Sequence, residues 1–169
     1  EDTATVTVQV NGRAVAVDDT AFTQENEAVQ ITVLSNDSDP DGDSLSVTAV
    51  TQPANGEVVI NADNTVTFTP DEGFFGTATF TYTVSDGNGG EDTATVTVQV
   101  NGKPDAVDDS VMTELDEAVQ ITVLSNDSDP DGDTLSVTAV TQPADGEVVI
   151  NADNTLTFTP DADFRGFTT

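Results

Sequence analysis

Residues 77–84 have the sequence TATFTYTV, and residues 93–100 have the sequence TATVTVQV. In both stretches apolar residues alternate with threonine or glutamine, as in an antiparallel strand with one dry face and one wet face. The apolar members are Ala78, Phe80, Tyr82, Val84, Ala94, Val96, Val98 and Val100. The two stretches therefore predict neighbouring strands that contribute one face each to a common core.

Five further segments have the same character, and clusters of Gly, Pro, Asn and Asp separate them. Strands are expected near 14–24 (broken), 28–34, 44–51, 57–60 and 64–69, followed by 77–85 and 92–100. No segment has a convincing helical period. Seven short strands in about 90 residues predict an all-β fold, a Greek-key sandwich of the immunoglobulin type without its usual Cys and Trp.

The chain repeats itself at an offset of 90 residues. Residues 1–12 are identical to 91–102, and residues 28–43 are identical to 118–133. The repeat predicts the last strand of a preceding copy at 1–12, a complete sandwich at 13–102, and a copy truncated before its last two strands at 103–169. We expect the chain to be part of a longer tandem array, with neighbouring repeats as partners.

The charge balance is strongly acidic. Asp and Glu number 32 against three Lys and Arg, and the formal net charge is −29. Such a charge repels nucleic acid and anionic membrane surfaces and favours divalent cations as partners. The sequence has no Cys and no His, so that no disulfide, zinc or redox-thiol site is expected. No apolar run approaches the roughly 20 residues that span a bilayer, and no membrane insertion is expected.

The candidate chemistry lies in a carboxylate-rich loop, residues 36–43, with the sequence NDSDPDGD. Calcium binds six to eight hard oxygens, which closely spaced carboxylates on a turning loop supply. Two unit charges about 4 Å apart repel by roughly 1 kcal/mol in water and roughly 4 kcal/mol at a dielectric of 20, so that an empty loop is costly. An EF-hand is excluded because Thr48 stands where its last ligand, Glu, would be. The candidate calcium ligands are Asp37, Asp39, Asp41 and Asp43, and in the second copy Asp127, Asp129, Asp131 and Asp133. A solvated acidic turn is the alternative.

Other acidic groups recur near the predicted junctions. Asp86 opens the connection between the last two strands, which is expected at the same end of the sandwich as the loop 36–43. Glu25, Asp71 and Glu72 are expected nearer the other end. The remaining candidate ligands lie after or within the linkers: Asp18, Asp19, Asn101, Asp105, Asp108 and Asp109.

Four motifs resemble the bacterial cadherin-like repeats of large RTX-type surface adhesins. They are AVDD at 16–19, NDSDPDGD at 36–43, YTVSDGNGG at 82–90 and TATVTV at 93–98. The resemblance implies Ca2+ binding, secretion to the bacterial cell surface, and a role as a spacer or in adhesion and biofilm cohesion.

The layout is more distantly similar to that of animal cadherins. In this resemblance Glu25 matches the first-strand glutamate, Asp37 and Asp39 match the D-x-D pair, and Asp86 matches the last acidic ligand. Asp71-Glu72 is a looser match to the D-x-E site. The linker lacks the D-x-N-D-N-A-P string, so that calcium ligation between domains is an implication of the resemblance alone.

Two rival functions have weaker support in the sequence. A module that binds polysaccharides, cell-surface glycans or other adhesin molecules is the alternative, although a lectin usually exposes Trp or Tyr. The chain has no Trp, and Tyr82 lies on an inward-facing pattern. Paired carboxylates could act in glycoside hydrolysis, but here they lie in repeated turns without a His, a Cys nucleophile or a cofactor motif. We therefore predict that the chain is not an enzyme.

Overall fold

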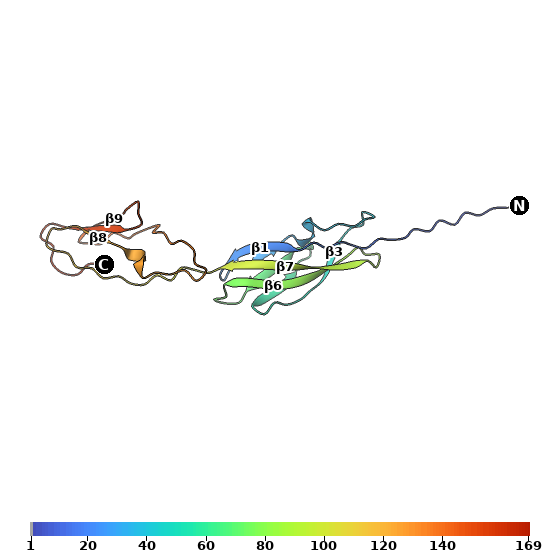
Figure 1. Ribbon diagram of the computed structural model, residues 1–169, viewed down its shortest axis with the longest axis horizontal. Coiled ribbons are helices and arrows are strands. Elements are labelled where there is room, and N and C mark those ends of the chain that lie inside the picture. The colour runs from blue at the N-terminus through green and yellow to red at the C-terminus, as the bar shows by residue number, and fades with distance from the viewer. Residues whose placement is uncertain (1) are drawn as a thin grey trace. The chain divides into compact units, whose positions relative to one another are not determined.

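The computed structural model describes residues 2–169. The chain divides into two compact units, Glu1–Gly102 and Lys103–Thr169, and both are all-β (Figure 1). Each contains one short 3-10 turn, η1 (Val33–Ser35) in the first and η2 (Val123–Ser125) in the second. Over the described residues, no helix has the length and apolar character needed to cross a membrane.

The first unit is a sandwich of two sheets. Its strands are β1 (Asp19–Gln24), β2 (Val29–Ile31), β3 (Ser46–Val50), β4 (Gly56–Ile60), β5 (Val66–Pro70), β6 (Gly76–Ser85) and β7 (Glu91–Asn101). One sheet has the order β1-β7-β6-β3 and the other has the order β2-β5-β4. All contacts are antiparallel except the parallel pairing of β1 with β7. The predicted Ig-like sandwich is confirmed.

The core lies between the inner faces of the two sheets, as the alternating pattern predicts. On β6 and β7, Phe80 pairs with Val96 and Tyr82 pairs with Ala94, and all four side chains are buried. The ring of Phe80 stacks on Phe68 of β5, with 6.3 Å between ring centroids, and so joins the two sheets. The threonines between these residues face outward because successive side chains of a strand point to opposite faces.

The predicted strand boundaries hold with one clear exception. The strand expected at 28–34 ends at Ile31, and the chain continues as the 3-10 turn η1, in which the Ser35 N–H donates to the Thr32 carbonyl at 3.0 Å. This turn keeps Val33 fully buried while it redirects the backbone into the acidic loop. The break expected within 14–24 is also present, because only an isolated bridge between Val15 and Ser38 precedes β1.

The second unit reproduces only one of the two sheets. Its strands are β8 (Val119–Ile121), β9 (Gly146–Ile150) and β10 (Leu156–Pro160), in the order β8-β10-β9. This is the counterpart of β2-β5-β4. Residues 109–114 and 136–140, the counterparts of β1 and β3, are not strands. In the first unit β1 pairs with β7 and β3 pairs with β6. The described residues of the second unit contain counterparts of only the first four residues of β6 and of none of β7.

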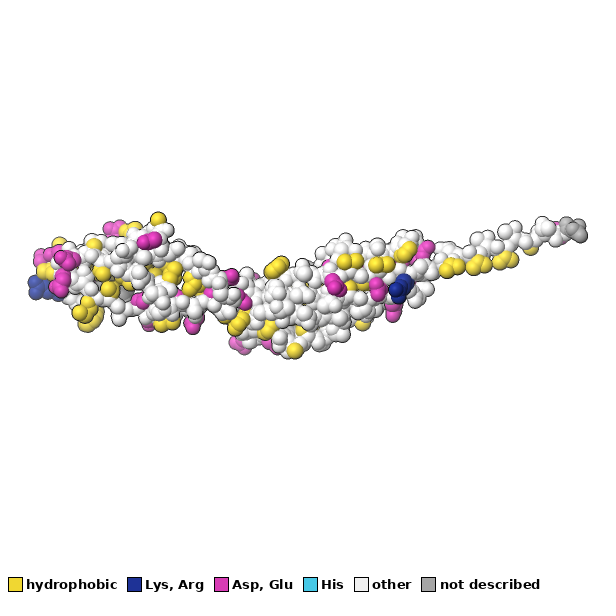
Figure 2. Space-filling model, viewed as in Figure 1, with side chains coloured by type: hydrophobic (Ala, Val, Ile, Leu, Met, Phe, Trp, Pro, Cys, Tyr) yellow, Lys and Arg dark blue, Asp and Glu magenta, His cyan; other side chains and the backbone are white. Residues whose placement is uncertain are grey.

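The N-terminal segment, residues 2–12, is extended but forms no strand with the described residues. Its apolar side chains make an exposed row (Figure 2), in which Val6, Val8 and Val10 are 85%, 77% and 82% exposed. The identical residues of β7 are buried. That residues 1–12 are the last strand of a preceding copy stays a prediction, and Glu1 lies outside the described residues.

Candidate metal site

The carboxylate of Asp39 stabilises the turn of the acidic loop through hydrogen bonds to the loop backbone. The loop connects η1 to β3, and Asp39 Oδ1 accepts hydrogen bonds from the backbone N–H groups of Asp41 at 2.8 Å and Asp43 at 3.2 Å. Gly42 has a φ of 79°, a left-handed conformation that glycine adopts without steric cost. The result is a tight turn in which Asp39, Asp41 and Asp43 each offer a carboxylate oxygen, all within 4.8 Å of one another.

This arrangement is chemically suited to a hard cation. Asp39 Oδ2 is buried and has no hydrogen-bond partner among the described residues. A buried acceptor without a partner costs about 1–3 kcal/mol, and more when it is charged. Three carboxylates in mutual contact add their repulsion to that cost. A calcium ion, which binds carboxylate oxygens at about 2.3–2.6 Å, would remove both costs.

The second unit folds its acidic loop in the same way. Asp129 Oδ1 accepts from the N–H groups of Asp131 at 2.9 Å and Asp133 at 3.1 Å, and Gly132 has a φ of 80°. At the start of the loop, Asp127 Oδ1 accepts from the Val107 N–H at 2.8 Å. Asp37 does the same for Val17 at 2.8 Å in the first unit. The backbone turn of the loop therefore forms without the sheet that the second unit lacks, but Asp129, Asp131 and Asp133 do not form the carboxylate cluster found in the first unit.

The turn that begins at Asp86 lies beside the acidic loop, as the sequence predicts. The Asn88 side-chain amide donates to Asp43 Oδ2 at 2.8 Å and joins the two segments. Asp86 itself is only 4% exposed, and its Oδ1 accepts from the N–H groups of Asn88 at 2.7 Å and Gly90 at 2.9 Å. Burial alone raises the pKa of Asp86, but these hydrogen bonds outweigh it and hold the pKa below its ordinary value.

Tyr82 belongs to this region as well, although its place in the alternating pattern predicts only a core position. Its hydroxyl oxygen lies 2.9 Å from both carboxylate oxygens of Asp37 and 3.1 Å from the Val33 carbonyl. Burial, together with the hydrogen bond to Asp37, raises the pKa of Tyr82 far above its ordinary value, so that the hydroxyl stays protonated. A buried Tyr normally needs a hydrogen-bond partner for its hydroxyl. A Tyr at an inward-facing position was therefore the sequence signal for a polar group nearby.

Asp18 and Asp19 face different surroundings. Asp18 Oδ1 accepts from the Thr95 N–H of β7 at 2.8 Å, which fixes the start of β1 against β7. Asp19 Oδ2 is buried without a hydrogen-bond partner among the described residues. Burial raises the pKa of Asp19, and the nearby charge of Asp37 raises it further. Asp19 therefore lies near Asp37, the first aspartate of the acidic loop.

The remaining candidates of the first unit lie at the far end of the sheet. The Glu25 N–H donates to the Asn101 carbonyl at 2.7 Å, so Glu25 lies where β7 ends. The Gly73 N–H, which follows Asp71 and Glu72, donates to Asn26 Oδ1 at 2.9 Å at this same end. Since β7 has 11 residues, it separates this end from the acidic loop by roughly 33 Å.

In the second unit, the residues around Asp105 make the contacts seen near Val15. Asp105 forms the isolated bridge with Ser128, and its N–H donates to the Ser128 carbonyl at 2.7 Å. The Asp108 carbonyl accepts from the Asn126 amide at 3.4 Å. Asp108 and Asp109 are exposed. No carboxylate cluster is found around them in the described part of the chain.

A family model described as a bacterial Ig domain matches residues 11–99 and again residues 101–169. No curated protein matches the chain. Among solved structures, a nucleoside hydrolase-related protein of Saccharophagus degradans is 20% identical over 53% of this chain and 26% of its own, with a TM-score of 0.41. An endo-fucoidan hydrolase of glycoside hydrolase family 107 is 17% identical over 93% of this chain and 28% of its own, with a TM-score of 0.43.

A fragment of titin, domains I67–I69 in a Glu-to-Ala variant, is 11% identical over 91% of this chain and 56% of its own, with a TM-score of 0.40. The chain spans about a quarter of the length of the nucleoside hydrolase-related structure and of the endo-fucoidan hydrolase structure.

Proposed function

Because the chain belongs to the bacterial Ig domain family, we propose that it is a calcium-binding extender or adhesion repeat of an extracellular bacterial surface protein. In this proposal calcium binds the acidic loop of each repeat and neutralises part of the net charge of −29. The neutralised array is stiffer, because loops that repel one another when empty are held together by the ion.

The observation that carries the proposal is the preorganised carboxylate cluster of Asp39, Asp41 and Asp43, with the buried and unpartnered oxygen of Asp39 within it. A surface loop whose acidic residues served only solubility would spread its carboxylates into solvent. The same backbone hydrogen bonds recur at Asp129, Asp131 and Asp133. The backbone turn is therefore common to both repeats, whereas among the described residues the three-carboxylate cluster is found at Asp39, Asp41 and Asp43.

Calcium is favoured over magnesium by the irregular ligand set. Magnesium requires near-ideal octahedral geometry and loses its water reluctantly, whereas calcium accepts six to eight oxygens in flexible arrangements. Extracellular calcium modules bind at about 0.1–1 mM, a range that suits a protein that acts outside the cell. Asp37 and Asp19, which lie beside the cluster, are the first candidates for further ligands.

Other ligands are proposed from their positions in the repeat. Asp86 and Asp18 lie at the loop end of the first unit, and Glu25, Asp71 and Glu72 lie at its far end. The linker side chains Asn101, Asp105, Asp108 and Asp109 complete the set by their place in the sequence. Ligation by these groups would add stiffness between repeats to the stabilisation of each loop.

Thermal unfolding of the chain in EDTA, in millimolar calcium and in millimolar magnesium tests the proposal. We expect calcium to raise the melting temperature well above both other conditions, because it binds the folded loops and not the unfolded chain. Equal melting temperatures in calcium and magnesium would contradict a calcium-specific site and would show that divalent cations only screen the negative charge. Small-angle scattering of a longer array in EDTA and in calcium then tests stiffening.

A further inference from the structure

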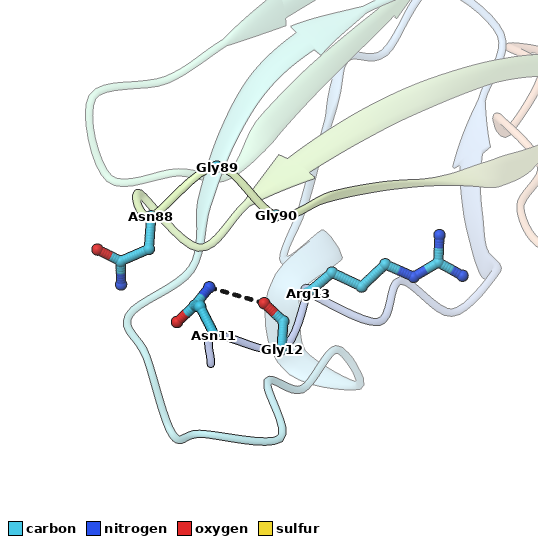
Figure 3. Close-up of a pocket in the computed structure, with 6 residues that line it drawn as sticks. All are labelled: Asn11, Gly12, Arg13, Asn88, Gly89 and Gly90. Atoms are coloured by element: carbon cyan, nitrogen blue, oxygen red, sulfur yellow. Dashed lines mark hydrogen bonds between the residues drawn. The ribbon is translucent and has the colours of Figure 1, made fainter. Parts of the chain in front are cut away.

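The end of the N-terminal segment is held by the acidic end of the first sandwich. The Asn11 side-chain amide donates to Asp86 Oδ2 at 2.8 Å, and the Gly12 backbone N–H donates to Asp41 Oδ2. Asn11 also donates to the Gly12 carbonyl at 2.7 Å, which fixes the dipeptide's own conformation (Figure 3). Residues 2–10 make no comparable hydrogen bonds among those described.

The dipeptide forms one wall of a pocket, opposite the turn that follows Asp86. The lining residues are Asn11, Gly12, Arg13, Asn88, Gly89 and Gly90 (Figure 3). A Cβ on Gly90 would lie 2.6 Å from the Arg13 Cα and would also meet Asp86 Oδ2. A Cβ on Gly12 would lie 2.8 Å from Asp41 Oδ2. Gly90 therefore leaves no room for a side chain against the Arg13 backbone, and a Cβ on Gly12 would push away the Asp41 carboxylate that accepts its N–H.

The hydrogen-bond inventory of Asp86 shows what this carboxylate recognises. Oδ1 accepts two backbone N–H groups of its own turn, and Oδ2 accepts the Asn11 amide. An ionised carboxylate only accepts, so that the group it binds must be a donor. Asparagine supplies such a donor without charge, whereas aspartate at the same position would place two carboxylates against each other.

We propose that this end of the sandwich is a metal-independent receptor for an Asn-Gly dipeptide that ends a preceding strand, with Asp86 and Asp41 as the recognising groups. The proposal goes beyond calcium binding and does not rest on it, since every contact is a hydrogen bond within the protein. The ligand is defined by its chemistry: an uncharged amide donor, followed by a residue without a side chain. The same two residues recur at the end of β7, where Asn101 is the last residue of the strand and Gly102 follows it.

Amide hydrogen exchange of the 15N-labelled full chain in EDTA tests the receptor. We expect the Gly12 N–H to exchange at least about tenfold more slowly than in an unstructured peptide, because a hydrogen bond to a carboxylate protects it. Asn11→Ala should return Gly12 toward the unprotected rate, and Asn11→Asp should do so more completely. Gln9→Ala, an exposed position in the same segment, is the matched control and should leave the Gly12 rate unchanged.

Two results would overturn the proposal. One is an unprotected Gly12 N–H in the wild-type chain in EDTA, and the other is Gly12 protection that survives Asn11→Asp. Asn11 lies outside the strands, so that its variants should retain the amide spectrum of β6 and β7, which reports folding. A failure of the chain to bind calcium would leave this test unaffected, because the test is made without metal.

Discussion

The hydroxyl oxygen of Tyr82 lies 2.9 Å from each carboxylate oxygen of Asp37, so that a fully buried core residue holds the first aspartate of the acidic loop. The contact connects the centre of β6 with the loop 45 residues earlier in the chain. It explains why an aromatic residue with a polar end occupies this core position, where phenylalanine would fill nearly the same volume.

Tyr82→Phe tests this contact. The variant keeps the ring but removes the hydroxyl, which leaves the carboxylate of Asp37 without this donor. We expect the free energy of unfolding to fall by about 1–3 kcal/mol, the usual cost of an unpaired buried polar group. Urea unfolding in EDTA, followed by circular dichroism, measures it. Thr79→Val on the outer face of β6 is the control, and equal losses in both variants would remove any special role of the Asp37 contact.

Asp39→Asn tests the charge of Asp39 separately from its role in the turn of the acidic loop. The asparagine side-chain oxygen can still accept from the N–H groups of Asp41 and Asp43, so the turn should survive while one carboxylate of the cluster is lost. We expect the stabilisation of the first unit by calcium to shrink strongly. In EDTA the melting temperature should not fall, because the variant removes one charge from the cluster. Isothermal titration calorimetry and melting curves measure the two effects. The exposed Glu57→Gln is the control for net charge, and a calcium response equal to that of wild type would exclude Asp39 as a ligand.

Asp19→Asn should stabilise the metal-free protein, with a defined pH dependence. Burial raises the pKa of Asp19 above the value of about 3.9 in the unfolded chain, so that ionisation favours the unfolded state. This cost is fully present above the folded pKa and disappears as the pH falls through it. We therefore expect the melting temperature of the variant in EDTA to exceed that of wild type at about pH 7, with a difference that narrows toward pH 4.

Asp63→Asn is the control, because the pKa of Asp63 is shifted in the opposite direction from that of Asp19. The hydroxyl and N–H of Thr65 hold the pKa of Asp63 below its ordinary value, so that its stabilising contribution is present above the unfolded pKa and is lost as the pH falls through the folded pKa. Both variants remove one negative charge. A similar rise in melting temperature for both would show that general charge repulsion, and not the burial of Asp19, is responsible.

Adding the sequence of residues 80–102 after Thr169 should complete the second sandwich. The added segment supplies counterparts of most of β6 and all of β7, which are the partners of β3 and β1 in the first unit. We expect residues 109–114 and 136–140 to become strands with slowly exchanging amides, measured by hydrogen exchange. A scrambled extension of the same composition is the control. Unchanged exchange in these residues with the native extension would contradict the expectation.

Much of the fold was predictable because its signals are local. Alternation along residues 77–84 and 93–100 fixes which side chains face the core, and the two strands are neighbours as predicted. The acidic loop was equally visible, since four Asp in seven residues have few structural explanations. The end of β2 at Ile31 was not predictable, because the change to a 3-10 turn depends on burial of Val33 against the opposite sheet.

The organisation of the site needed the tertiary structure. The sequence could place Asp86 at the loop end of the sandwich, but not show that its Oδ2 faces Asn11 instead of the carboxylate cluster. Nor could it show that Asp18 binds the backbone of β7 while Asp19 is buried beside Asp37. These distinctions depend on side-chain positions that differ by a few ångströms between residues adjacent in the sequence.

The sequence by itself determined the period of the repeat, the alternation of its strands and the composition of its acidic loops. The tertiary structure decided what each copy of a sequence becomes. Residues 91–101 form β7, with Val96, Val98 and Val100 at most 2% exposed, whereas the identical side chains of Val6, Val8 and Val10 are at least 77% exposed. The physical reason is that a strand satisfies its backbone hydrogen bonds and buries its apolar face only against neighbouring strands.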